Sequence, residues 1–123
     1  MILDCYKVLK RIEPRPAMFT GENSLKSIVT FLQGYQEALF DHDLIRFTKA
    51  IDPFFDWVAH RLGYFESTAG WANMILAYSL GFDTREILWE DLFNRNVSLE
   101  EHEKSVRLFY ELVEQFKKEM ETP

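Results

Sequence analysis

The sequence contains three histidines, and one of them has a carboxylate at a spacing that suits metal binding. His60 follows Asp56 by four residues, so a helix would place both side chains on one face, where they could bind a metal ion. His42 and His102 also lie beside acidic residues, but no second pair on another helix completes a recognisable set of ligands. A surface hydrogen bond therefore explains Asp56 and His60 better, and we predict no metal site.

Covalent catalysis needs a nucleophile with a base beside it, and no such pair can be assembled. Ser24, Ser67, Thr68 and Cys5 have no histidine at a spacing that a known motif requires. The five glycines are scattered and form no phosphate-binding loop. Cys5 is the only cysteine, which excludes an internal disulfide and a cysteine-based zinc site, so we interpret it as a packing residue. We predict no enzyme and no cofactor.

Carboxylates near the C-terminus are the strongest candidates for a function. The net charge is -6, and residues 83–123 hold eleven acids against six bases. Such a surface repels nucleic acid and anionic lipid and favours a basic partner. We predict a partner-binding surface on the last two helices, formed by Glu86, Glu90, Asp91, Glu100, Glu101 and Glu103. Glu86 and Glu90 are expected on one helix face.

A cluster of four bases near the N-terminus is too short to indicate nucleic-acid binding. It consists of Lys7, Lys10, Arg11 and Arg15, and nearby acids balance it. The helices that could serve as recognition helices are acidic or apolar. We therefore interpret the cluster as a solvated helix end, where cations favour the negative pole of the helix dipole.

Length and composition predict one helical domain. A chain of 123 residues with 47% apolar residues can bury a single core. No apolar run approaches eighteen residues, so we expect no membrane span. The first residues lack the pattern of a secretory signal, so a cytoplasmic location is expected.

The fold should be organised around residues 68–80, because a helix that is apolar on nearly every side must be surrounded by others. Ser67 or Thr68 can cap its start and Gly81 can take the left-handed turn at its end. The core is expected around Trp71, Met74, Ile75 and Tyr78.

A first helix is predicted over residues 2–13, with Leu3, Tyr6, Leu9 and Ile12 on its inner side. Pro14 and Pro16 end it, and the residue before each proline should be extended. Residues 15–21 should then form a non-helical connector. This connector is either a recognition loop or a rigid linker whose Met18 and Phe19 plug the core, and burial of its apolar side chains favours the linker.

The clearest amphipathic pattern runs from Asn23 or Ser24, either of which can cap a helix, to about Phe40. Gly34 lies within it and is expected to mark the close approach of another helix. The inner stripe consists of Leu25, Ile28, Val29, Leu32, Tyr35 and Leu39.

Four further helices complete the expected architecture. A short helix over residues 44–51 should lead to one that Asp52 caps and that ends at Gly63, followed by a packed loop through Tyr64 and Phe65.

A capping box over residues 83–86 should start the next helix, which buries Ile87, Leu88 and Leu92, with Trp89 or Phe93 as further candidates, and ends near residues 94–96. A second box, Ser98 with Glu101, should start the last helix, which runs to about Glu119. Its expected buried residues are Leu99, Val106, Phe109, Leu112 or Val113, Phe116 and, less firmly, Met120. No strand pattern is present, so we predict an all-α, single-domain orthogonal bundle of about five to seven helices over residues 1–123.

The order of several segments resembles a pattern shared by small helical bacterial proteins. The segments are residues 15–21, 24–25, 31–35, 57–61 and 70–76, and the resemblance covers about residues 12–95. These proteins are similar to immunity proteins encoded beside polymorphic toxins, including those of contact-dependent growth inhibition. The resemblance implies a cytoplasmic inhibitor that binds and blocks the toxic domain of a sibling's effector, commonly a nuclease. The class is diverse in fold, so it implies no particular binding residue.

Three functional hypotheses follow. The first is an immunity protein that neutralises a basic toxin domain by stoichiometric binding through the acidic surface. The second is a non-enzymatic helical adaptor or structural domain that self-associates through exposed aromatic side chains. The third is a metal-dependent hydrolase that uses Asp56 and His60. The sequence leaves the identity of the toxin, the coverage of its active site and the oligomeric state open.

Overall fold

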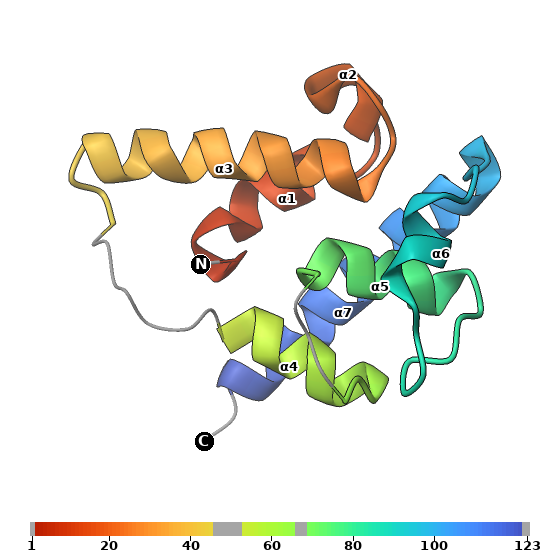
Figure 1. Cartoon of the computed structure of the whole chain (residues 1–123). Helices are drawn as coiled ribbons and strands as arrows, with labels where there is room; N and C mark the ends of the chain where they lie inside the picture. Colours follow the sequence, from red (N-terminus) through yellow and green to blue (C-terminus); the bar gives the residue numbers. More distant parts are fainter. Residues whose placement is uncertain (1, 46–52, 66–68, 122–123) are drawn as a thin grey trace.

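The computed structural model describes residues 2–45, 53–65 and 69–121, and over these ranges the chain is helical with no strand. The all-α prediction is therefore confirmed (Figure 1). The elements are the 3-10 helix η1 (Ile2–Cys5) and the α-helices α1 (Tyr6–Ile12), α2 (Pro16–Thr20), α3 (Leu25–Asp41), α4 (Pro53–Leu62), α5 (Trp71–Ser79), α6 (Trp89–Phe93) and α7 (Leu99–Glu121). None of these helices is both long enough and apolar enough to cross a bilayer.

The longest helix, α7, is the element on which most of the others pack. It contacts α3, α4 and α5, and it buries one face along its middle. The buried residues are Ser105, Val106, Phe109, Tyr110, Leu112, Val113 and Phe116. The expected burial of Leu99 and Met120 is wrong, because these residues lie at the two ends of the helix and are 68% and 52% exposed.

Aromatic rings fill the contact between α4, α5 and α7. The Phe109 ring of α7 stacks on Trp71 of α5, with 4.9 Å between ring centroids. Phe54 of α4 meets the edges of Trp71 and Phe116 at 5.5 Å and 5.3 Å. Phe54 and Phe109 are fully buried, so these rings form the centre of the core.

The expected central helix is shorter and less enclosed than predicted. It begins at Trp71 after Gly70, and the proposed caps Ser67 and Thr68 lie outside the described residues. Gly81 ends it with φ +88°, as predicted. Its buried residues are Met74, Ile75 and Ala77. Tyr78 is 46% exposed, because α3, α4 and α7 cover only part of the circumference of α5.

The N-terminal helix buries Leu9 and Ile12 as predicted but departs from the predicted stripe in its first half. Its first turn is the tighter helix η1, and Leu3 and Tyr6 are only half-buried. The inward residues are Ile2, Cys5, Val8, Leu9 and Ile12. Burial raises the pKa of the Cys5 thiol, which suits the packing role that we predicted.

The connector after α1 differs from the prediction in two respects. Glu13 is helical (φ -50°, ψ -44°) rather than extended, because its N–H continues the helical pattern by donating to the Leu9 carbonyl. Residues Pro16–Thr20 form the short helix α2, in which Pro16 occupies the first position, where no N–H is needed. The Thr20 hydroxyl hydrogen-bonds the carbonyls of Pro16 and Glu22 at 3.0 Å and 2.8 Å.

The side chains expected to plug the core from this connector do not do so. Met18 is 74% exposed and Phe19 is 47% exposed. Pro16 is the buried residue of α2, so α2 reaches the core through its first residue only. Burial of Met18 and Phe19 therefore does not favour a linker over a recognition loop for residues 15–21, contrary to the prediction.

Helix α3 follows its prediction except at Gly34. Ser24 caps it by accepting a hydrogen bond from the Ser27 N–H at 3.3 Å, and the inward residues Leu25, Ile28 and Leu32 are buried. Val29, Tyr35 and Leu39 are half-buried. Gly34 is exposed, and a methyl group built there would meet no atom within 4 Å. No helix that the structure describes approaches it, so the expected close contact is wrong.

The segment before α6 is tied to α4 instead of starting a helix. The Thr84 hydroxyl hydrogen-bonds the carbonyls of Leu62 and Gly63 at 2.9 Å and 3.2 Å, and the Asp83 carboxylate accepts the Arg85 N–H at 3.0 Å without starting a helix. The capping box predicted over residues 83–86 is therefore wrong. Helix α6 therefore begins only at Trp89. Leu92 is buried as expected, but Leu88 and Phe93 are 68% and 60% exposed.

Two further expectations concern the residues around α4. Tyr64 is buried, with its hydroxyl bonded to the Met74 carbonyl, whereas Phe65 is 86% exposed and does not pack. The short helix expected over residues 44–51 and the cap Asp52 lie mostly or wholly outside the described residues.

The exposed glycine in α3 gives a direct test of the fold. Gly34→Ala should raise the free energy of unfolding by roughly 1 kcal/mol, because alanine loses less backbone entropy in a helix and meets no neighbour here. Urea denaturation measures the change. Gly81→Ala is the matched control and should destabilise, because φ is +88° there. Loss of stability in Gly34→Ala would contradict the exposed position of this residue.

Candidate functional site

The predicted acidic surface lies where α6 and α7 begin. Glu90 and Asp91 occupy the first turn of α6, and Glu100 and Glu101 occupy the first turn of α7. Glu86 precedes α6, so the expectation that it shares a helix face with Glu90 is wrong. Most of these carboxylates are exposed, while Glu101 and Glu103 are half-buried.

Glu101 serves the structure and not the acidic surface. Its carboxylate accepts the Ser98 N–H at 3.0 Å while the Ser98 hydroxyl accepts the Glu101 N–H at 3.1 Å, which confirms the second capping box. Arg95 also pairs with it. The Ser98 N–H, with the Arg95 charge beside it, lowers the pKa of this carboxyl group. Glu101 is therefore already neutralised by the chain itself.

The other five carboxylates form no ion pair with any residue that the structure describes. We call them the acidic flank: Glu86, Glu90, Asp91, Glu100 and Glu103. The nearby bases Arg85 and Lys104 are exposed and are likewise unpaired over the described ranges. The negative field of this region is therefore only partly compensated.

Exposed apolar side chains accompany the acidic flank. Leu88 directly precedes α6, Phe93 is its last residue, and Leu99 is the first residue of α7; each is at least 60% exposed. The Phe93 ring is held in place by stacking on Trp89, which in turn stacks on the buried Tyr64 at 5.8 Å. Apolar anchors surrounded by charge are typical of protein-binding surfaces.

A hollow of about 660 Å³ lies between α2 and α7. Met18 lines it from α2 and Leu99 lines it from α7, together with His102 and the carboxylates Glu22 and Glu103. We call it the α2–α7 hollow. The hollow places the exposed Met18, which we predicted in the core, near Glu103 of the acidic flank.

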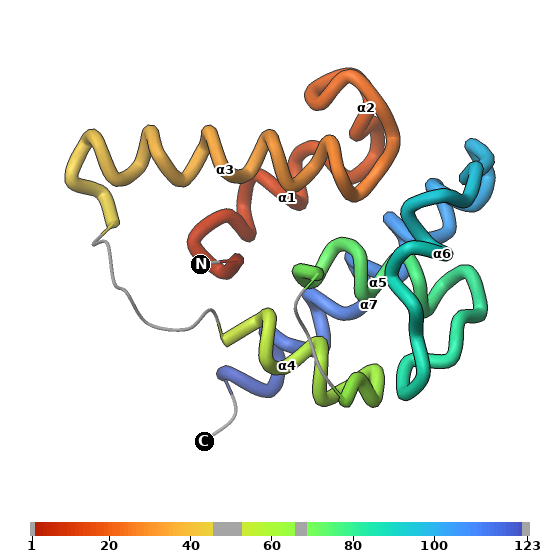
Figure 2. Tube along the Cα trace, viewed as in Figure 1, coloured from red at the N-terminus to blue at the C-terminus, as the bar shows by residue number. Residues whose placement is uncertain are grey.

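A second hollow, of about 610 Å³, lies between α3 and α5. Trp71, Leu76 and Phe93 give it an apolar lining. His102 lines both hollows, so they meet at this residue. The tube in Figure 2 shows the course of the chain through the helices involved, from α2 into α3 and from α5 through α6 into α7. The surface around His102 is thus concave, partly apolar and acidic at one side.

Of the histidines and bases singled out in the sequence, His102 lines both hollows and Arg15 lines the α2–α7 hollow, whereas the others line neither. Asp56 and His60 are exposed on α4, and no group of three or more histidine, cysteine, aspartate or glutamate side chains that could hold a metal occurs among the described residues. Lys10 pairs with Glu13 and Glu114, while Lys7, Arg11 and Arg15 remain exposed at the surface.

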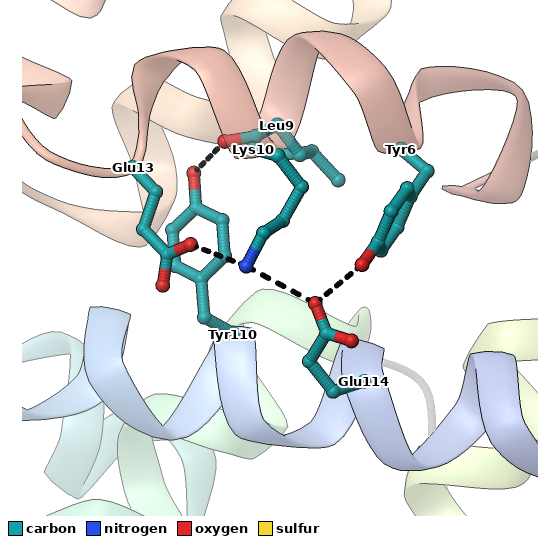
Figure 3. A network of polar contacts seen from close by, with 6 residues as sticks. All are labelled: Tyr6, Leu9, Lys10, Glu13, Tyr110 and Glu114. Carbon is teal, nitrogen blue, oxygen red and sulfur yellow. Dashed lines mark hydrogen bonds and ion pairs between the residues drawn. The ribbon is translucent and has the colours of Figure 1, made fainter.

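Shifted pKa values occur away from the acidic flank, where α1 meets α7 (Figure 3). The Tyr6 hydroxyl donates to the Glu114 carboxylate at 2.7 Å, and Lys10 pairs with the same oxygen at 3.2 Å. The hydrogen bond from Tyr6, supported by Lys10, lowers the pKa of Glu114, and that same bond raises the pKa of Tyr6. Tyr110 donates to the Leu9 carbonyl at 2.8 Å. These side chains bond to groups of the same chain and join α1 to α7.

Sequence reasoning missed Met18, Phe93 and the α2–α7 hollow as parts of a site. The available signal was Pro16, which is as well suited to the first turn of a helix as to a linker. A one-turn helix leaves most of its side chains without a neighbour. That geometry exposes Met18.

Comparison of the chain with protein-family models, with curated proteins and with solved structures found no match.

The joint between α1 and α7 predicts a pH dependence. A lowered carboxyl pKa adds stability above its ordinary value of 4.5, and that stability is lost as the pH falls through the lower folded value. Tyr6→Phe should therefore raise the pKa of Glu114 and destabilise the fold at neutral pH, with the difference shrinking under acidic conditions. An NMR titration of the Glu114 carboxyl carbon measures this.

Tyr110→Phe is the control for that titration. It also removes a hydroxyl that bridges α7 to α1, but its partner is the Leu9 carbonyl. The pKa of Glu114 should stay unchanged in this variant. Equal shifts in both variants would contradict a direct effect of Tyr6 on Glu114.

Proposed function

We propose that this chain is an immunity-type inhibitor that binds a basic toxin domain, such as a nuclease, in a stoichiometric complex in the cytoplasm. The observation that carries the proposal is the juxtaposition of the acidic flank with the exposed side chains Leu88, Phe93 and Leu99. The resemblance of several sequence segments to immunity proteins agrees with it.

Each half of this surface has a separate physical task. Unpaired carboxylates attract a basic protein from a distance and raise its association rate. Exposed apolar side chains lose water when the partner arrives, and they supply the part of the binding energy that slows dissociation. An inhibitor that must capture a toxin before it acts needs both properties.

Self-association through the same surface is disfavoured by its charge. In a two-fold symmetric dimer the same patch of each copy faces its counterpart. The carboxylates of two acidic flanks would then approach one another, which is repulsive. A partner of opposite charge avoids this cost, so the acidic flank favours the inhibitor over the adaptor.

The function is tested with the product of the gene directly upstream. The tagged chain should retain that protein in a pull-down, and co-expression should restore the growth of cells that it kills. A chain that neither binds the product nor protects the cells would defeat the proposal. An unrelated basic nuclease serves as the negative control and should not be retained in the pull-down.

The acidic flank itself is tested by removing three charges. The triple variant Glu90→Gln, Asp91→Asn, Glu100→Gln should slow association with the toxin about tenfold at low ionic strength, and the difference should shrink as salt is added. Stopped-flow fluorescence measures the rate.

A matched control removes three exposed charges on other parts of the molecule. It combines Glu37→Gln on α3, Asp56→Asn on α4 and Glu111→Gln on α7. Both triple variants have the same net charge, so the control isolates position. If both slow association equally, net charge and not the acidic flank guides the partner.

A further inference from the structure

The α2–α7 hollow has two exposed apolar walls that come from distant parts of the chain. Met18 projects from α2 and is 74% exposed; Leu99 projects from the start of α7 and is 68% exposed. Exposed apolar side chains that face one hollow from both sides suit an interaction site, because covering them removes apolar surface from water.

The frame of the hollow is fixed by local hydrogen bonds. On one side, Thr20 bonds to Pro16 and Glu22, and the nearly buried Ser24 caps α3. On the other side, the capping box of Ser98 and Glu101 fixes the first turn of α7. A site whose walls are already ordered loses little entropy when it is filled.

The polar groups of the hollow indicate a basic occupant. Glu22 and Glu103 contribute two carboxylates against the one guanidinium of Arg15, and Glu100 lies in the same first turn of α7 as Leu99. The lining therefore has a net negative charge, which favours a basic side chain in the hollow.

We infer that the α2–α7 hollow receives one large apolar side chain of the basic toxin domain, with a lysine or arginine beside it that pairs with Glu103 or Glu22. Met18 and Leu99 form the walls against the apolar side chain. This inference rests on the proposed function and adds the place at which the partner is anchored. It also makes residues 15–21 a recognition element.

Four single variants of the full chain test the anchor by isothermal titration with the toxin domain. Met18→Ser and Leu99→Ser should each weaken binding about tenfold, as expected for anchor residues. Met120→Ser and Leu44→Ser are the controls and should change the dissociation constant less than twofold. The leucine pair is closely matched, at 68% and 69% exposed.

The possible outcomes separate the anchor from the function. All four side chains are exposed, so thermal unfolding should be nearly unchanged and any loss of affinity reflects binding. If the wild-type chain binds the toxin domain and Met18→Ser and Leu99→Ser bind it as tightly as the two controls do, the proposed anchor is overturned. The proposed inhibitor function then still stands. Absence of any wild-type complex overturns both.

One further outcome concerns a different occupant. Light scattering could show a wild-type dimer that Met18→Ser and Leu99→Ser, but not the controls, convert to monomers. The hollow would then belong to a second copy of the chain, and the inference would be overturned.

Discussion

The stacking of Phe109 on Trp71 is the contact on which the rest of the bundle depends. It joins the middle of α7 to the start of α5, and Phe54 completes the cluster from α4. These rings are large and meet in edge-to-face and offset arrangements, so they define how the three helices cross. The beginning of α7, where the carboxylates and Leu99 lie, extends beyond this cluster and is free of the packing that it imposes on the middle.

The N-terminal helices are attached to α7 by a different kind of contact. Figure 3 shows that polar bonds from Tyr6, Lys10 and Tyr110 cross from α1 to α7 or back. Hydrogen bonds demand specific geometry, whereas apolar contacts tolerate sliding. This joint therefore fixes the position of α1 along α7. Since α2 follows α1 directly, the joint also helps to determine where Met18 lies relative to Leu99.

The sequence predicted the helical class and the main features of α3 and α7, because their periodic apolar residues and serine caps act within a single element. It did not predict which apolar residues stay exposed. Met18, Leu88 and Leu99 are as apolar as core residues, but they stay exposed because no other element among the described residues packs over them. The capping box predicted over residues 83–86 failed for a related reason: the Thr84 hydroxyl ties this segment to carbonyl groups at the end of α4.

The acidic surface could be predicted in composition but not in detail. Six carboxylates were expected to act together, and one of them, Glu101, is taken by Arg95 and Ser98. The spacing of Ser98 and Glu101 predicts a capping box. The same spacing therefore also indicates that Glu101 does not belong to the predicted partner-binding surface. Glu101 is bonded to Arg95 and Ser98, so it contributes less negative field to this surface than an unpaired carboxylate does.

The short helix α2 lies between Pro14 and Gly21, and its turn is closed by Thr20. A segment so restrained has few alternative conformations to sample in solution. A molecule that meets this segment finds it largely in one conformation, so contact with it needs no slow rearrangement of α2 beforehand.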